Sequence, residues 1–215
     1  YHDHRDTLIE DYAQAAIALA DLNYFVFRMG NIVGSQFHVD HPLVIDYATS
    51  EFQTDFLDIW LMANCRFCIT TGTGLDEVAH IFGRPAVYVN YLPAIDVASY
   101  SRNVSVFKHL EWKDKAKRLS LSEHLVHSYN SSFEYADNGI VVKDLTPGEI
   151  KDAVLELEAR IKGEWDETVR DRILQNRFWE LLKRHPNYQD YHGFVHPQAR
   201  IGAAFLAANH NLFLQ

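Results

Sequence analysis

The sequence predicts an α/β protein in which a mostly parallel β-sheet carries helices on both of its faces. Segments with apolar residues at helical spacing alternate along the chain with short apolar runs that are typical of strands. These runs lack a clean apolar–polar alternation, as expected for strands that are buried on both faces. The chain has 215 residues, of which 47% are hydrophobic, so it is long enough for one substantial core.

The first part of the chain supplies this alternation. The expected helices have apolar residues three and four positions apart, and the expected strands are rich in aromatic and β-branched residues. In order, the pattern predicts a helix over 7–22, strands over 24–27 and 44–47, a helix over 54–65, a strand over 66–70, a helix over 74–83 and a strand over 86–90. The strands over 24–27, 66–70 and 86–90 are expected to share one parallel sheet.

Helices dominate the second part of the chain. An extended stretch is expected over 105–112 and a strand over 138–146, and helices are expected over 119–128, 146–163, 166–185 and 199–213. Thr146 is placed to cap the helix that Pro147 begins, because proline is favoured at the first helical position. The sequence therefore predicts a Rossmann-like domain over 1–145, with a helical extension over 146–215 packed on the same domain.

The charge balance argues against broad electrostatic binding of polyanions. The formal net charge is −9, whereas a general binder of nucleic acid or of anionic membranes carries a basic excess. No nucleic-acid partner is expected. No run approaches the ~20 apolar residues that span a bilayer, and no signal peptide is visible. The chain begins at Tyr1 within a charged segment, so we expect it to be part of a longer protein.

Two cysteines, Cys65 and Cys68, have the C-x-x-C spacing that occurs in redox and zinc motifs. Here they fall at the start of an expected buried strand, whereas a redox thiolate is stabilised at a helix N-terminus. A zinc site needs two more ligands at recognisable spacing. We expect two free core thiols and no bound metal.

Small polar residues after the 66–70 strand form the first candidate site. They are Thr70, Thr71, Gly72, Thr73 and Gly74. Ligands of open parallel sheets collect at the carboxyl ends of the strands, and a helix N-terminus offers unpaired N–H groups to a phosphate. Glycines permit close approach and threonines add hydroxyl donors. The pattern predicts a phosphate cradle, and an ordinary capped strand-to-helix turn is the alternative.

Three further residues stand at strand or helix ends. Arg28 follows the 24–27 strand and suits bidentate phosphate contact, and Gly30 would let a ligand approach it. We expect Arg28 to reach the same anion as the cradle, although a surface ion pair is the alternative. Glu77 and its neighbour Asp76 lie in the first turn of the expected 74–83 helix. Such acids either serve the helix dipole, or one of them, for which we select Glu77, holds ribose hydroxyls in a nucleotide site.

The N-terminal segment YHDHRD concentrates titratable groups before the first helix. Asp3 is a candidate general base, and Arg5 is a candidate anion contact. His2 and His4 also have a spacing that invites a metal, with Asp3 and Asp6 as further ligands. A charged loop without a bound metal is the simpler interpretation.

Together these motifs resemble a family of bacterial glycosyltransferases tied to surface-polysaccharide gene sets. The resemblance rests on RMG at 28–30, on the stretch from VIDY to AVYVN at 44–90, and on the terminal segments YHDHRDTLIEDY and ARIGAAFLAANHNLF. It covers nearly the whole chain and is most specific over 1–93. It implies a GT-B enzyme, in which two Rossmann-like domains face a cleft and the C-terminal one binds the nucleotide-sugar donor. This chain would be that C-terminal half.

The order of elements is more distantly similar to the donor domain of O-fucosyltransferase-like enzymes. In that group an arginine after the first strand contacts the donor diphosphate, and a later loop rich in serine and threonine contacts its phosphates. The loop over 70–74 matches the later one. In the glycosyltransferase family an H-V-R-D-S-like segment lies upstream of YHDHRD, so one arginine of the site is expected outside this chain. Arg5 would then make a secondary contact, to the acceptor or to phosphate.

The resemblance implies transfer of a sugar from a nucleotide-sugar to a glycan or lipid-linked acceptor, in the cytoplasm or at the inner face of the membrane. It implies no cofactor and no metal, because helix N–H groups and an arginine can neutralise the leaving diphosphate. Arg28, Thr71, Thr73 and the backbone of 72–74 would do so, and Asp3 would be a candidate for deprotonating the acceptor. Donor base, donor sugar, acceptor and stereochemistry are left open.

Two other functions compete with transfer. A non-catalytic α/β module would bind a nucleotide or sugar with the same cradle, and a structural fragment would use its C-terminal helices for assembly. The expected partners are an N-terminal domain of the same protein and a second copy of this chain. The last helix would brace that domain, so its apolar side is expected to be partly unpaired here and to favour association.

Overall fold

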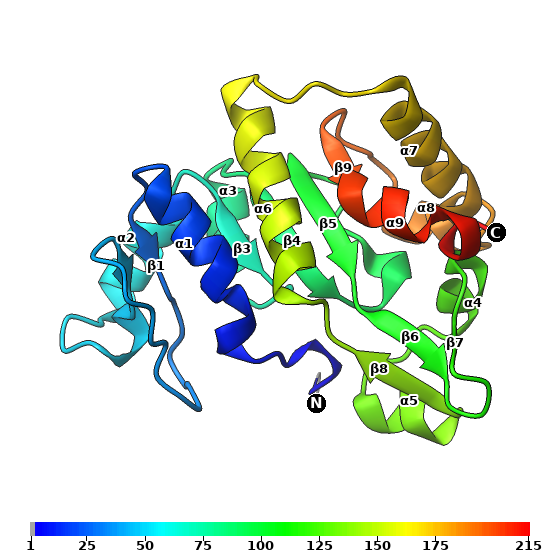
Figure 1. Cartoon of the computed structure of the whole chain (residues 1–215), viewed down its shortest axis with the longest axis horizontal. Coiled ribbons are helices and arrows are strands. Elements are labelled where there is room, and N and C mark those ends of the chain that lie inside the picture. Colours follow the sequence, from blue (N-terminus) through cyan, green and yellow to red (C-terminus); the bar gives the residue numbers. More distant parts are fainter. Residues whose placement is uncertain (1–2) are drawn as a thin grey trace.

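Four parallel strands form the centre of the structure, a computed structural model that describes residues 3–215 (Figure 1). In sheet order they are β3 (Cys68–Thr70), β4 (Ala86–Tyr91), β5 (Asn103–Phe107) and β9 (Ala199–Ile201). Every residue of β4 is buried, as expected for a strand covered on both faces. Because all four strands are parallel, their carboxyl ends meet at one edge of the sheet.

Helices flank this sheet. α1 (Ala13–Asp21) and α6 (Pro147–Lys162) pack on each other over its front face, whereas α3 (Asp76–Ile81) lies behind β3 and β4 (Figure 1). α7 (Val169–Leu182) and α9 (Ala203–Phe213) pack together beside α6. The predicted class, a parallel α/β fold with flanking helices, is confirmed, and its architecture is Rossmann-like in the generic sense.

Two small sheets accompany the central one. β1 (Val26–Phe27) and β2 (Val44–Ile45) form a parallel pair. β6 (His109–Trp112) pairs antiparallel with β7 (Lys117–Arg118) and β8 (Ile140–Lys143). The expectation that the 24–27 strand joins the central sheet is wrong within the described residues, because β1 pairs with β2 alone. The segments that precede β1 and β3 are nevertheless in contact, since the ring of Tyr24 packs against that of Phe67.

The remaining helices complete the chain, and side-chain caps set the starts of several helices. They are η1 (Asp3–Arg5), η2 (Ile9–Tyr12), η3 (Tyr47–Thr49), η4 (Ala94–Asp96), α2 (Asp55–Asn64), α4 (Leu121–Val126), α5 (Ser132–Asp137) and α8 (Tyr188–Tyr191). Thr146 and Glu149 form a capping box at α6, with Pro147 in its first turn, as predicted. Ser120 caps α4 in the same way.

The C-terminal segment differs from its prediction in two respects. A continuous helix over 199–213 is wrong for its first residues, which form β9 on the free edge of β5. The apolar side of α9 is also fully used, since Phe205, Leu206 and Phe213 are at most 5% exposed. Phe205 and Phe213 pack on the ring of Phe107. The expectation of a partly unpaired last helix is therefore wrong.

Exposed apolar side chains gather instead on α2 and the turn before it. Phe52, Phe56 and Trp60 are 50–75% exposed. Within the part of the chain that the structure describes, no helix combines the length and apolar character that a membrane crossing requires.

Candidate functional site

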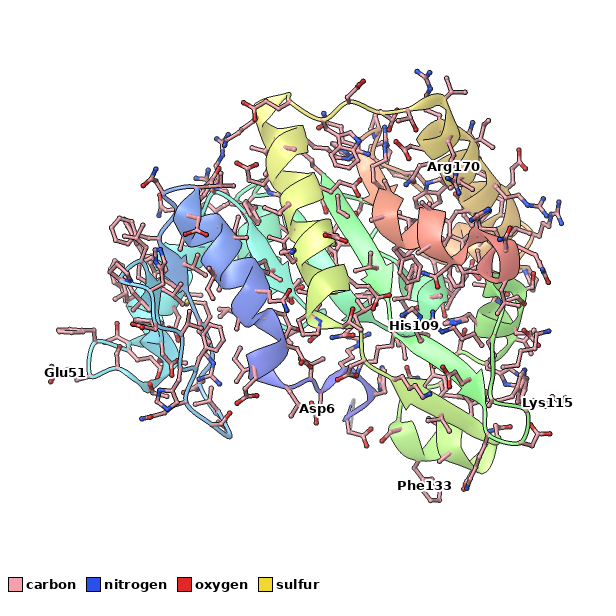
Figure 2. All side chains as sticks on the ribbon, viewed as in Figure 1. Asp6, Glu51, His109, Lys115, Phe133 and Arg170 are labelled. Atoms are coloured by element: carbon pink, nitrogen blue, oxygen red, sulfur yellow. The ribbon has the colours of Figure 1, made fainter. Side chains whose placement is uncertain are left out.

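The N-terminal segment is tied to the carboxyl ends of three central strands. Arg5 donates from Nη1 to the carbonyl of Gly72, after β3, at 2.8 Å, and from Nε to that of Leu92, after β4, at 3.1 Å. Lys108, directly after β5, donates from Nζ to the carbonyl of Asp6 at 2.7 Å. Figure 2 shows Asp6 at this edge, below α1. The segment thus carries its charged groups to the edge where ligands of α/β proteins collect.

Arg5 is an oriented cation with donors to spare. A guanidinium has five N–H donors, and two of them hold the carbonyls of Gly72 and Leu92. Its carbon lies 5.5 Å from the centre of the Tyr91 ring, and that ring is fixed because the Tyr91 hydroxyl donates to the carbonyl of Asp96. No carboxylate among residues 3–215 forms an ion pair with Arg5 within 4.0 Å. Asp96 is close enough for Arg5 to lower its pKa against the effect of burial, so the charge of Arg5 is only partly compensated and can still attract an anion.

The loop after β3 is shaped by its first threonine and first glycine. The hydroxyl oxygen of Thr70 accepts from the backbone N–H of Gly72 at 3.0 Å and, more weakly, from that of Thr73 at 3.5 Å. Gly72 has φ +85°, and a Cβ there would lie 2.7 Å from the Tyr91 ring, so only glycine fits. The predicted role of the Thr73 N–H in binding phosphate thus competes with Thr70.

The outer part of the same loop is open. Thr73 and Gly74 are exposed, Thr71 is half-buried, and a Cβ built on Gly74 would meet nothing within 4 Å. The helix that follows is shorter than predicted, since α3 begins at Asp76 and has six residues. Its N-terminus is therefore a weaker source of positive potential than a long helix would be. Hydroxyls, the Gly74 backbone and Arg5 are the groups left to face an anion.

The acidic residue that the structure singles out on α3 is Asp76 rather than Glu77. Asp76 is 2% exposed, its Oδ1 has no hydrogen-bond partner among the described residues, and burial raises its pKa to about 6. Glu77 is exposed, with its carboxylate 3.6 Å from His80 and 3.4 Å from the Tyr100 hydroxyl. A buried acid with a displaced pKa is typical of functional sites.

The sequence offers Asp76 beside Glu77, and Glu77 is the predicted site residue, although one signal favours Asp76. Asp76 lies three residues before Ala79, which is completely buried, and residues three apart share one side of a helix. Asp76 therefore belongs to the side of α3 that faces the sheet. The neighbouring Glu77 points away from it.

Arg28 and Gly30 do not join this site. Arg28 donates from Nη1 to Asp46 and to the carbonyl of Ser35, each at 3.0 Å, and its side chain is 9% exposed. Within residues 3–215, no hydrogen bond or ion pair connects it to the 70–74 loop, so the expected convergence is not found. Gly30 serves local packing, because at its φ of +147° a Cβ would lie 2.8 Å from Val33.

The ion pair of Arg28 is well built. Burial alone would raise the pKa of the Asp46 carboxyl, but the backbone N–H of Phe37 and the Arg28 guanidinium together hold it below its usual value. Thr49 donates to the same carboxylate at 2.9 Å. Three donors, of which Arg28 is one, thus keep Asp46 ionised. The carboxylate in turn compensates the charge of Arg28.

Asp3 is engaged at the start of α5. Its carboxylate accepts from the backbone N–H of Ser132 at 2.9 Å and from the Ser132 hydroxyl. The hydroxyl contact, followed by the backbone contact, lowers the pKa of Asp3. A carboxylate with a lowered pKa is a weaker base, so this geometry favours an anchoring role over the predicted proton abstraction.

No metal site is visible in the described part of the chain. His2, which the sequence offered as a metal ligand, lies outside the described residues. His4 is buried near the ring of Tyr135. No group of three or more His, Cys, Asp or Glu residues among residues 3–215 is arranged to hold a metal ion. Cys65 and Cys68 are free, as predicted, and burial raises the pKa of both thiols.

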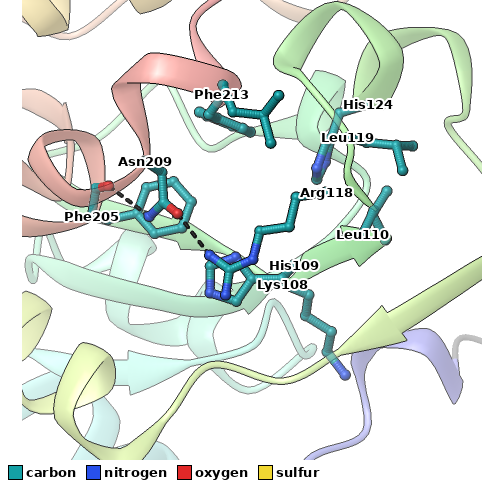
Figure 3. A pocket seen from close by; sticks show the side chains of 10 residues that line it. Lys108, His109, Leu110, Arg118, Leu119, His124, Phe205, Asn209 and Phe213 are labelled. Atoms are coloured by element: carbon teal, nitrogen blue, oxygen red, sulfur yellow. Dashed lines mark hydrogen bonds between the residues drawn. The ribbon is translucent and has the colours of Figure 1, made fainter. Parts of the chain in front are cut away.

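A cavity beside the carboxyl edge is too small for a substrate. It lies between β6, β7, α4 and α9 and has a volume of about 20 Å³ (Figure 3). Arg118 donates to Asn209 across it at 2.9 Å. Burial lowers the pKa of His124, on its wall, to about 3, so this imidazole is neutral. The volume suits about one water molecule.

Comparisons of the chain with protein-family models, with curated proteins and with solved structures gave no match. The candidate site therefore stands on its own geometry, in which Arg5, the hydroxyls of Thr71 and Thr73 and the open Gly74 lie at neighbouring strand ends. A guanidinium with hydroxyl and backbone donors is a suitable set for a phosphate oxyanion.

Proposed function

We propose that this chain is the donor-binding half of a GT-B glycosyltransferase that transfers a sugar from a nucleotide-sugar to a glycan or lipid-linked acceptor of a surface polysaccharide. The family resemblance and the parallel α/β fold support this function. The observation that carries it is the placement of Arg5, which bridges the loops after β3 and β4 and has no carboxylate partner within the described residues.

In this function the residues of the chain act on the leaving group. Transfer breaks the bond between the anomeric carbon and the diphosphate oxygen, so negative charge grows on the diphosphate. Arg5, the hydroxyls of Thr71 and Thr73 and the N–H of Gly74 would bind that charge, and fixed donors stabilise developing charge most effectively. Arg28 has no part in this step, because Asp46 already compensates its charge.

One observation favours a second candidate, a binding module without catalysis. Asp3, the carboxylate that the sequence offered as a base, is held by Ser132 with a lowered pKa. In the transferase the base would then come from the N-terminal domain. Without such a domain, the same donor site would bind a nucleotide-sugar and leave it intact.

Calorimetric titration of UDP and GDP tests the site. Arg5→Ala removes a charge-assisted contact worth roughly 1.5–3 kcal/mol, so the affinity should fall about 10- to 100-fold. Gly74→Val places a branched side chain where the phosphate should lie, in space that is empty in the protein, and should weaken binding without unfolding the chain. Unchanged affinity in both variants, with intact wild-type binding, would place the donor site elsewhere.

Arg170→Ala is the matched control for this titration. Arg170 is exposed on α7, at the opposite side of the molecule from Asp6 (Figure 2), and has no hydrogen bond or ion pair with the described residues. Its removal changes the net charge by the same amount as Arg5→Ala. Affinity in this variant should equal that of the wild type at moderate salt.

Release of nucleoside diphosphate separates the two candidate functions. The full-length protein is incubated with UDP-, GDP-, CMP- and dTDP-linked sugars and an acceptor glycan, and nucleotide release is followed. If the wild type releases nucleoside diphosphate and the Arg5→Ala variant does not, the result supports the transferase. Binding of a nucleotide-sugar with no release in any combination supports the module.

A further inference from the structure

A cavity lined by three arginines lies at the edge of the central sheet that is opposite the Arg5 site. Its volume is about 160 Å³, and its lining includes Arg102, Arg160, Arg200, Trp165 and Gln198. These residues come from the amino end of β5, the last turn of α6, the segment after α6 and the start of β9. In Figure 1 this region lies at the upper ends of α6 and β5, whereas the N-terminus lies at the lower edge. The cavity is therefore separate from the Arg5 site.

Positive charge exceeds negative charge in this cavity. Arg160 pairs with Glu156 at 2.8 Å and with Glu167 at 3.4 Å, and Arg200 pairs with the same Glu167 at 3.5 Å. Arg102 donates to the carbonyl of Arg160 at 2.6 Å but has no carboxylate partner among residues 3–215. Three guanidinium groups thus share two carboxylates, in a chain with a net charge of −9.

Unused hydrogen-bond donors line the same space. Trp165 lies with its ring 4.9 Å from the Arg160 guanidinium carbon, and its Nε1 is buried without a partner in the described structure. Leaving a buried donor unpaired costs about 1–3 kcal/mol. Arg102 uses one of its five N–H donors. The spare donors of Arg102 suit an acceptor-rich ligand and not a cation. The Trp165 Nε1 is covered by protein atoms, so its ring would have to turn toward the cavity to add a further donor.

The volume of the cavity and the arrangement of its donors restrict the class of ligand that it can bind. The cavity has several times the volume of the one-water cavity beside α9, which suits a small polyatomic ion. Its donors arrive from three separate elements, more than the two oxygens of one carboxylate can serve. A tetrahedral oxyanion offers oxygens in several directions, and arginine is the usual partner of phosphate. We propose that this cavity binds a phosphate group, either free phosphate or that of a small monoester.

The competing explanation is purely structural. The last turn of a helix leaves carbonyl groups unpaired, and Arg102 satisfies that of Arg160. In that case the guanidinium groups only close the end of α6, and the cavity holds water. This explanation predicts no saturable binding of phosphate at this edge.

Titration of inorganic phosphate into the full chain decides between the two. The variants are Arg102→Gln, which removes the uncompensated charge, and Trp165→Phe, which removes the orphan N–H and keeps an aromatic ring. We expect saturable wild-type binding that weakens at least 10-fold in Arg102→Gln and several-fold in Trp165→Phe. Arg170→Gln, the matched control, should bind as the wild type does, and acetate should not compete.

Arg5→Ala separates this cavity from the donor site. Phosphate binding that persists in Arg5→Ala and is lost in Arg102→Gln supports the proposal, whatever the outcome of the nucleotide titrations. Binding that is absent, or that depends on Arg5 alone, overturns it. Glycerol phosphate distinguishes the two sources of the ligand: equal affinity indicates recognition of the phosphate group itself, and tighter binding indicates a monoester.

Discussion

Arg28 and Arg5 both reach the carboxyl ends of parallel strands, yet they differ in what holds their charge. Arg28 forms a nearly buried ion pair with Asp46 at 3.0 Å. Arg5 contacts two neutral carbonyls, those of Gly72 and Leu92. A carboxylate compensates the first cation, whereas carbonyls only orient the second. A position at a strand end is therefore not enough to identify an arginine that could bind an anion. The direct partners of that arginine must also be neutral.

The carboxyls of the two regions also differ in what surrounds them. The Phe37 amide and Arg28 hold the pKa of Asp46 below its usual value despite burial. Burial raises the pKa of Asp76, at the start of α3, to about 6. In the first region a direct ion pair balances the two charges. In the second, Arg5 has no direct ion pair and interacts with Asp96 only at longer range, and the buried Asp76 has no ion-pair partner among the described residues.

The largest expected effect is that of Arg28→Ala on stability. Removing Arg28 leaves the nearly buried Asp46 carboxylate without its counter-ion, although Phe37 and Thr49 still donate to it, so the free energy of unfolding should fall by about 3 kcal/mol. Affinity for UDP or GDP should not change at temperatures where the variant is folded. Urea denaturation and calorimetric titration measure the two quantities.

A double variant checks the physical reason for that loss. Arg28→Ala combined with Asp46→Ala removes the orphan carboxylate and should recover part of the lost stability. A nucleotide affinity that falls with Arg28→Ala alone would overturn the contrast between the two arginines.

An intermediate effect is expected from Asp76→Asn, and it depends on pH. The folded pKa, about 6, lies above the ordinary aspartate value of 3.8. The contribution of Asp76 to stability is therefore full below pH 4 and is lost as pH rises through 6. The loss is at most about 3 kcal/mol.

Urea midpoints of wild type and Asp76→Asn should therefore diverge between pH 4 and pH 8. The variant should gain stability relative to the wild type as the pH rises. Parallel curves over this range would mean that Asp76 titrates normally. Asp46→Asn serves as the contrast, because a lowered pKa contributes stability that is lost as pH falls.

The smallest stability effect is expected from Thr70→Val. This nearly isosteric change removes the oxygen that accepts from Gly72 and Thr73, so it should cost about 1 kcal/mol. Because these amides shape the loop, nucleoside diphosphate affinity should fall several-fold. Thr54→Val, which removes a comparable cap bond at α2, should destabilise the chain similarly and leave the affinity unchanged.

Local signals in the sequence predicted most of the elements correctly. The cap at Thr146 with Pro147, and the strands over 66–70 and 86–90, depend on interactions between near neighbours and on burial patterns. The structure contains both, and the two strands pair in parallel. The end of the chain was missed because β9 forms only where the edge of β5 offers hydrogen bonds, and such an edge overrides local helix propensity.

By itself, the sequence determined the α/β class, the short buried strands and the small-residue loop at 70–74, because these follow from residue type and spacing. Only the tertiary structure decided which arginine meets that loop. Arg5 reaches partners 67 and 87 positions away, whereas Arg28 finds Asp46 at the end of the adjacent β2. Electrostatic pairing depends on distance in space, which the order of residues does not contain.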